Sequence, residues 1–144
     1  MPYWRTYYHI NWAVKGREPL ISSAIETLMF PALAGKAREL GGMLFAANGT
    51  ADHVHVATVI PPRISVAEFV RHLKGLSSHL VRQEFDPAFN WQSGYGVVTF
   101  GERHLNAVVR YVRDQKAHHA NGTTRNTLEA ICSDDDGPAP PLGW

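Results

Sequence analysis

The sequence predicts an α+β fold built on a four-stranded antiparallel sheet, and three observations support this prediction. Segments rich in aromatic and β-branched residues alternate with stretches of helical periodicity in the order strand, helix, strand, strand, helix, strand. Clusters of glycine, proline and asparagine separate these segments. A chain of 144 residues, 44% hydrophobic and 19% charged, is long enough for one domain with a buried core.

The first strand and the first helix lie within the N-terminal third of the chain. Residues 4–14 are aromatic and β-branched and end at a turn-forming cluster, which is typical of a strand. Ser22 or Ser23 then caps a helix that stops at Gly41-Gly42. We expect Pro31 to bend this helix without dividing it.

A hairpin and a second helix follow. Residues 43–48 and 52–60 form two strands with a tight connection, which predicts an antiparallel pair. Pro61-Pro62 ends the second strand, and Ser65 caps the next helix with Glu68 as its capping-box partner.

Two further elements complete the predicted fold. Asp86-Pro87 ends the second helix, and residues 89–100 give a fourth strand that contains glycines. A third helix runs from about residue 102 to 119, and one stripe of it carries His104, Val108, Tyr111, Val112 and Gln115. The order βαββαβ predicts a ferredoxin-like, RRM-like sheet with two helices on one face and the additional C-terminal helix on the other.

The composition of the C-terminal end predicts a domain boundary and an uneven distribution of charge. We expect a single domain over residues 1–122 and a short, partly disordered, acidic and proline-rich tail over residues 123–144. Glu129 and three aspartates lie at this end, so residues 1–128 carry 14 basic and 9 acidic side chains, a net charge of +5. A basic body suits a polyanionic partner, although an ordinary solvated surface has the same composition.

The expected location is the cytoplasm. No apolar run approaches the length that spans a membrane, and the first residues lack the apolar segment of a signal peptide. Cys132 is the single cysteine, which excludes an internal disulfide or a thiolate metal cage.

The strand at residues 52–60 carries two histidines that suit a metal ion. His53 and His55 share one face of the strand, while Val54 and Val56 take the other. Imidazole nitrogens held on a rigid strand can bind a divalent metal. Two packed or surface histidines would show the same pattern.

Tyr111 and Gln115 lie one turn apart on the third helix. If they face the histidines, the site holds two imidazoles, an amide oxygen and a phenol. A tyrosine hydroxyl attacks phosphorus when a metal polarises the phosphate. An amphipathic core tyrosine is the alternative interpretation of Tyr111.

Four segments, at residues 52–55, 71–78, 91–96 and 109–119, resemble in this order the single-tyrosine HUH transposases. This family comprises small insertion-sequence transposases and REP-associated tyrosine transposases, and the resemblance covers about residues 5–120. It implies that His53, His55 and Gln115 bind Mg²⁺ or Mn²⁺ and that Tyr111 is the nucleophile. Tyr95, between two glycines, is the alternative nucleophile.

The resemblance also implies a substrate and an assembly. Single-stranded DNA with hairpin ends would be cut and rejoined through a 5′-phosphotyrosine. Without a long C-terminal extension, a homodimer with active sites shared between subunits is expected. Predicted phosphate contacts, each with ordinary surface charge as its alternative, are Arg71, Lys74, Arg110, Arg113 and Lys116.

Three other functions fit part of the pattern. A replication-initiator-like nickase uses the same chemistry but cuts a single hairpin without joining two ends. A non-catalytic nucleic-acid-binding module would have structural histidines and bind without metal. A metal hydrolase would release its product without a covalent step.

Overall fold

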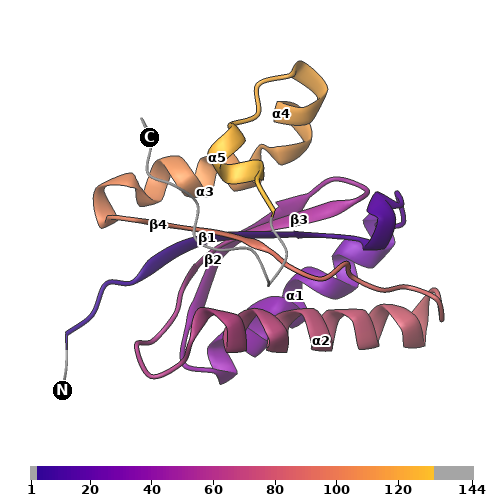
Figure 1. Cartoon of the computed structure of the whole chain (residues 1–144), viewed down its shortest axis with the longest axis horizontal. Coiled ribbons are helices and arrows are strands. Elements are labelled where there is room, and N and C mark those ends of the chain that lie inside the picture. The colour runs from indigo at the N-terminus through magenta and orange to yellow at the C-terminus, as the bar shows by residue number, and fades with distance from the viewer. Residues whose placement is uncertain (1–2, 132–144) are drawn as a thin grey trace.

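The computed structural model describes residues 3–131, in which a four-stranded sheet has helices on both faces (Figure 1). The spatial order of the strands is β2-β3-β1-β4, and every neighbouring pair is antiparallel. The strands are β1 (Tyr7–Ala13), β2 (Met43–Gly49), β3 (His53–Val59) and β4 (Gly96–Phe100). The predicted ferredoxin-like arrangement, with its hairpin between β2 and β3, is therefore confirmed.

Two long helices, α1 (Ser23–Glu39) and α2 (Val66–Glu84), cover one face of the sheet (Figure 1). Both predicted caps are confirmed, because Ser22 Oγ and Ser65 Oγ each accept a hydrogen bond from the backbone N–H three residues on, at 3.2 and 3.1 Å. Pro31 lies inside α1, which continues through it as one helix. The main core lies between these helices and the sheet and includes Ile10, Trp12, Met29, Leu33, Val54, Val56, Phe69 and Leu73.

The opposite face of the sheet carries short helices. They are η2 (Glu102–His104), α3 (Leu105–Arg113), α4 (Gln115–Asn121) and α5 (Asn126–Glu129); the remaining short helix, η1 (Lys15–Arg17), follows β1. A small apolar cluster of Ala46, Ala57 and Val112 joins α3 to this face. Strand alternation places His53 and His55 on the same side as this cluster, away from the main core.

The predicted third helix over residues 102–119 is wrong in its continuity. It is interrupted at Asp114, whose φ of −95° and ψ of 18° leave the helical region, and α4 begins at Gln115. Aspartate is a poor residue for a helix interior because its side chain competes for backbone hydrogen bonds. His104 is exposed and does not belong to the buried stripe.

The predicted fourth strand over residues 89–100 is too long, since only Gly96–Phe100 pairs along β1. Trp91 makes a single bridge with Val14, and its indole N–H donates to Ser77 Oγ at 3.0 Å. Gly94 has a positive φ of 88°, which turns the chain before β4 begins. The aromatic composition of this segment therefore serves packing rather than strand pairing.

Near the C-terminus, the sequence did not predict α5, which contacts β1 and β4. Cys132 and the aspartates and prolines after it lie outside the described residues. Within residues 3–131, no helix is both long and apolar enough to pass through a membrane.

Candidate active site

His53 lies at the start of β3, where neighbouring residues hold one of its ring nitrogens and leave the other available. Its Nδ1 lies 2.6 Å from Asp52 Oδ1 and 2.9 Å from Thr50 Oγ1. A carboxylate on one imidazole nitrogen fixes the tautomer and leaves the other nitrogen, Nε2, for a ligand. Burial opposes the protonated form, but hydrogen bonds to Glu129 and Asp52 outweigh it and raise the pKa of His53.

His55 is fully buried and is oriented by a second buried histidine on β1. Its Nδ1 lies 2.8 Å from Nε2 of His9, and the two rings are 4.9 Å apart. Burial and the neighbouring His55 lower the pKa of His9 to about 3, so that His9 is neutral. Burial also lowers the pKa of His55, which leaves its Nε2 suited to a ligand.

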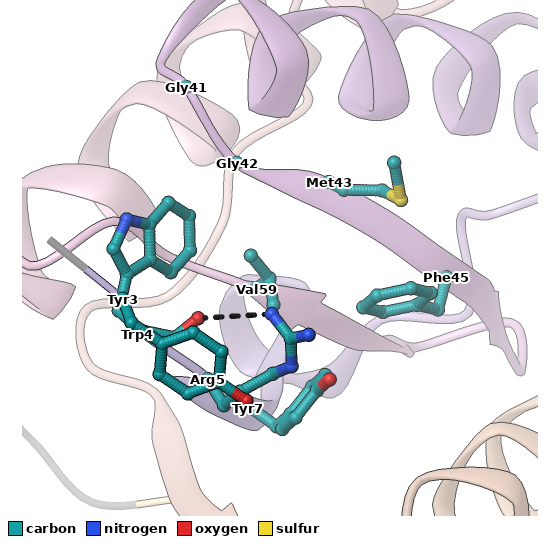
Figure 2. A pocket seen from close by; sticks show the side chains of 9 residues that line it. All are labelled: Tyr3, Trp4, Arg5, Tyr7, Gly41, Gly42, Met43, Phe45 and Val59. Carbon is teal, nitrogen blue, oxygen red and sulfur yellow. Dashed lines mark hydrogen bonds between the residues drawn. The ribbon is translucent and has the colours of Figure 1, made fainter. Parts of the chain in front are cut away.

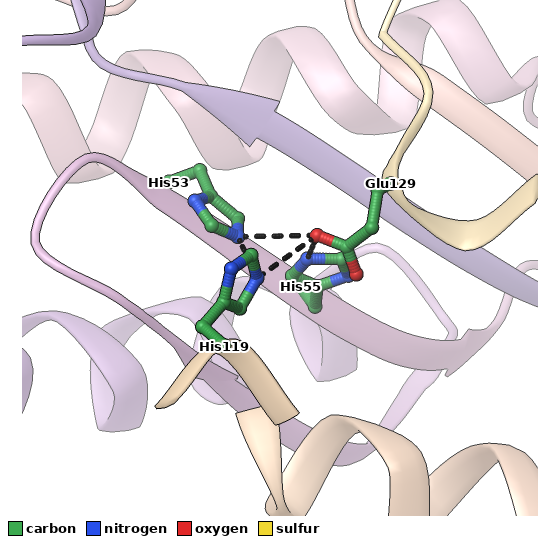
Figure 3. A group of neighbouring side chains, drawn as sticks. All are labelled: His53, His55, His119 and Glu129. Atoms are coloured by element: carbon green, nitrogen blue, oxygen red, sulfur yellow. Dashed lines mark hydrogen bonds and ion pairs between the residues drawn. The ribbon is translucent and has the colours of Figure 1, made fainter. Parts of the chain in front are cut away.

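His119 on α4 and Glu129 on α5 complete a cluster with these two histidines (Figure 3). Glu129 Oε1 lies 3.4 Å from His53 Nε2, 3.2 Å from His55 Nε2 and 3.1 Å from His119 Nε2. The four candidate ligand atoms all lie within 4.8 Å of one another. Burial raises the pKa of Glu129, but hydrogen bonds from His53, His55 and Tyr111 outweigh it and lower that pKa well below its usual range. The cluster therefore contains a carboxylate and three imidazoles that could hold a metal ion.

Tyr111 lies against this cluster. Its hydroxyl donates to Glu129 Oε2 at 2.5 Å and accepts from the backbone N–H of Arg125 at 2.9 Å. The ring stacks on His118 with the centroids 4.6 Å apart. Burial raises the pKa of Tyr111, and the hydrogen bond to Glu129 acts in the same direction, so the phenol is protonated at neutral pH.

Gln115 is fully buried beside Tyr111, despite the break in the helix between them. Its Oε1 lies 3.1 Å from His119 Nε2, and its Nε2 is 3.5 Å from both the backbone oxygen of Tyr111 and Glu129 Oε2. The structure thus brings together the tyrosine, the glutamine and the two histidines that the sequence singled out.

Sequence reasoning missed three members of this site, namely His9, His119 and Glu129. The His-x-His-like alternation of β1, with polar His9 and Asn11 between apolar residues, was a usable signal for the first. Glu129 carries no distinguishing signal, because it lies near the three aspartates of the acidic C-terminal segment. The Asn11 side chain holds the Glu129 backbone oxygen at 3.1 Å, a contact that only the folded chain reveals.

The five predicted phosphate contacts differ in their surroundings. Arg71, Arg110 and Arg113 are exposed. Lys74 Nζ donates to the backbone oxygens of Gln92 and Gly94 at 2.9 and 3.0 Å. Lys116 Nζ contacts Glu26 Oε2, Asn48 Oδ1 and the Gly49 oxygen at 2.8, 2.7 and 3.2 Å. Both lysines therefore tie elements of the fold together.

A cavity of about 410 Å³ lies away from this cluster, at the end of the sheet where β2 begins (Figure 2). Its lining consists of Tyr3, Trp4, Arg5, Tyr7, Gly41, Gly42, Met43, Phe45 and Val59. None of the clustered histidines, Tyr111 or Glu129 lines it, so the chemistry is assigned to the open cluster and not to this cavity.

Comparison with known proteins adds the family context. The family described as "Transposase IS200 like" matches residues 2–115. The transposase for insertion sequence element IS200 of Salmonella typhimurium is 29% identical over 119 residues, which are 78% of each chain. The ISDra2 transposase TnpA of Deinococcus radiodurans is 23% identical over 115 residues, 75% of this chain and 82% of that protein.

Two solved structures share the fold. One is a Deinococcus radiodurans protein provisionally described as a transposase, with a TM-score of 0.64 and 24% identity over 80% of this chain and 95% of that one. The other is a REP-associated tyrosine transposase bound to a REP hairpin, with a TM-score of 0.61 and 13% identity over 86% of this chain and 76% of that one.

Proposed function

Because the chain belongs to the IS200-like transposase family, we propose that it cuts and rejoins single-stranded DNA through a covalent bond between Tyr111 and a 5′-phosphate. One observation supports this mechanism above all others. The Tyr111 hydroxyl lies against a cluster of three imidazoles, two of them buried, and a carboxylate, which is where an attacking group and a metal ion would have to meet.

In the proposed reaction, the Tyr111 oxygen attacks the phosphorus of a phosphodiester. The bond from the Tyr111 oxygen to phosphorus forms as the bond from phosphorus to the 3′-oxygen breaks. The tyrosine hydroxyl releases its proton to water, and the departing 3′-oxygen takes a proton from water. The phosphotyrosine conserves the free energy of the broken phosphodiester bond. The 3′-hydroxyl of another DNA end can therefore attack the phosphotyrosine and rejoin the strand.

We propose Mg²⁺ or Mn²⁺ as the cofactor, held at least by His53 and His55 with Gln115 beside them. The donor set fits a cation, since buried imidazoles have their Nε2 atoms directed to one point, where a carboxylate already lies. When bound, the ion would polarise a phosphate oxygen and stabilise the charge that develops during attack.

The proposed substrate is DNA with hairpin ends. A neighbour of the same fold is described as bound to a REP hairpin, which supports this substrate class. Arg110 and Arg113 lie on α3 on either side of Tyr111 in sequence and are exposed, so they are the favoured phosphate contacts. Arg71 lies on α2, which covers the opposite face of the sheet.

The sequence-based expectation of a homodimer with shared active sites stays a prediction. In a single chain, Tyr111 already shares the Glu129 carboxylate with His55, so we favour attack by each tyrosine at the histidines of its own chain. The two arrangements give opposite results when inactive variants are combined.

The test is a trapping experiment on denaturing gels. Labelled single-stranded element ends with Mn²⁺ should give a protein–DNA adduct that is lost in Tyr111→Phe and in the His53→Ala, His55→Ala double variant. Tyr95→Phe is the matched control and should keep the adduct. An adduct that persists in Tyr111→Phe would overturn the assignment of the nucleophile. Intact DNA binding without any adduct would favour the non-catalytic module instead.

A further inference from the structure

The segment that follows the family match contains His119 and Glu129, both of which reach the site. We propose that His119 is a third imidazole ligand of the metal ion and that Glu129 serves two partners, the ion through Oε1 and the Tyr111 hydroxyl through Oε2. This proposal rests on the proposed function and adds two residues that lie beyond the matched region.

The distances within the cluster fit a four-coordinate ion. His53 Nε2 and His119 Nε2 are 3.1 Å apart, and Oε1 of Glu129 lies 3.1–3.4 Å from the three imidazole nitrogens. An ion with four ligands at about 2.0–2.1 Å separates neighbouring ligand atoms by roughly 3.4 Å. Four of the six separations are therefore close to this value, and all six are 4.8 Å or less.

This donor set differs in chemistry from the one expected from the resemblance. Three imidazoles and one carboxylate suit Zn²⁺ or Co²⁺, whereas Mg²⁺ prefers oxygen ligands and octahedral geometry. Gln115 Oε1 lies 3.1 Å from His119 Nε2, so in this arrangement the glutamine positions His119. We expect Co²⁺ and Zn²⁺ to bind more tightly than Mg²⁺.

The ligands have supports that would hold them in this arrangement. Asp52 lies on His53 Nδ1, and His9 lies on His55 Nδ1. Glu129 is fixed through its backbone, because its oxygen accepts a hydrogen bond from Asn11. Partners of this kind orient metal ligands and raise metal affinity.

The second oxygen of Glu129 orients Tyr111. The phenol hydroxyl donates to Glu129 Oε2, 2.5 Å away, and accepts a hydrogen bond from the Arg125 N–H at 2.9 Å. These two contacts fix the direction of the tyrosine oxygen. Through its two oxygens, one carboxylate therefore holds the attacking oxygen beside the proposed ion.

Metal binding is tested directly on the full chain, without DNA. The Co²⁺ complex should show the intense visible absorption of tetrahedral coordination, and calorimetry should give at least tenfold weaker Co²⁺ binding for His119→Ala and for Glu129→Gln. The exposed residues His104 and Glu84 provide matched controls, His104→Ala and Glu84→Gln, which should bind as the wild type does. If both site variants keep wild-type binding and Gln115→Ala loses it, the proposed ligand set is overturned. This result would be independent of whether Tyr111 forms an adduct.

The contact with Tyr111 is tested in single turnovers at saturating metal. Glu129→Ala should slow adduct formation at least tenfold, because the tyrosine oxygen loses the partner that orients it. Glu84→Ala, at an exposed position, should leave the rate unchanged. A wild-type rate in Glu129→Ala would overturn the positioning role of Glu129.

Discussion

His9 illustrates how a single buried side chain can lower stability in acid and at the same time support metal binding. It is fully buried beside His55, and its Nδ1 has no hydrogen-bond partner among the described residues. Its pKa of about 3 lies below the ordinary value of 6.5, so the unfolded chain binds the extra proton first as the pH falls. The free energy of unfolding is therefore expected to decrease as the pH falls from 6.5 toward 3.

Replacing His9 with leucine should reduce this acid sensitivity. We expect the loss of unfolding free energy between pH 6.5 and 4 to shrink by roughly 2–3 kcal/mol, because the group that takes up the proton on unfolding is gone. Metal affinity should fall by about tenfold, since His55 loses the partner that orients it. Urea unfolding at several pH values and calorimetry measure the two effects.

The other titrating groups of the site do not account for the expected difference between wild type and His9→Leu. The lowered pKa values of His55, Asp52 and Glu129 also cost stability in acid, while the raised pKa of His53 opposes them, and all four groups remain in the variant. His104→Leu, at an exposed position, is the control. An unchanged pH dependence in His9→Leu would contradict the assignment of a neutral buried imidazole.

At the scale of the element, the site depends on how closely the segment around α5 approaches β4. A side chain at Gly96 would overlap the backbone oxygen of Ala130 and the side-chain oxygen of Asn11. Asn11 in turn holds the backbone of Glu129. The absence of a side chain at Gly96 is therefore a condition for the position of the carboxylate.

Gly96→Ala should displace this segment and weaken Co²⁺ binding at least tenfold, because the backbone oxygen of Ala130 has to move. The sheet itself should survive, with a loss of about 1–3 kcal/mol in the free energy of unfolding from overpacking. Gly101→Ala is the matched control, since nothing lies within 4 Å of the added carbon. Equal metal affinities in the two variants, measured by calorimetry, would show that the position of Glu129 does not depend on this contact.

Elements with a local signal were predictable from the sequence. The caps of α1 and α2 depend on a serine and the turn that follows it, and the histidine strand alternates because it lies between a core and an open face. The tyrosine and glutamine remain neighbours because four residues separate them, even across the break at Asp114.

Elements that depend on distant contacts were not predictable in the same way. In the segment before β4, the Trp91 indole donates a hydrogen bond to Ser77 of α2. Its aromatic residues therefore pack against a distant helix, although their composition is typical of a strand. The helix α5 has four residues and is too short for a periodic signal. Its place is set by Asn11 and Gly96, which are far from it in sequence, and so Glu129 was missed.

For the whole molecule, the two faces of the sheet have different roles, one in stability and the other in carrying the candidate site. The large apolar core on the side of α1 and α2 stabilises the fold, while the other face has only a small apolar cluster and is free to carry buried polar groups. This division explains why the histidines, the tyrosine and the carboxylate can all lie on one rigid surface.

The completeness of the site in one chain leads to the last prediction. Tyr111→Phe retains the histidines and the double variant His53→Ala, His55→Ala retains the tyrosine, so a mixed dimer could be active only if subunits shared their sites. Because Tyr111 and His55 of the same chain contact one carboxylate, we expect mixtures to form no more adduct than the separate variants. Co-expression with two different tags, purification through both and trapping on labelled DNA measure this. Recovery of the adduct in doubly tagged protein would instead establish exchange of the tyrosine between subunits, as the sequence predicted. Failure to recover any doubly tagged protein would agree with cleavage within one chain, since a stable pair would not exist.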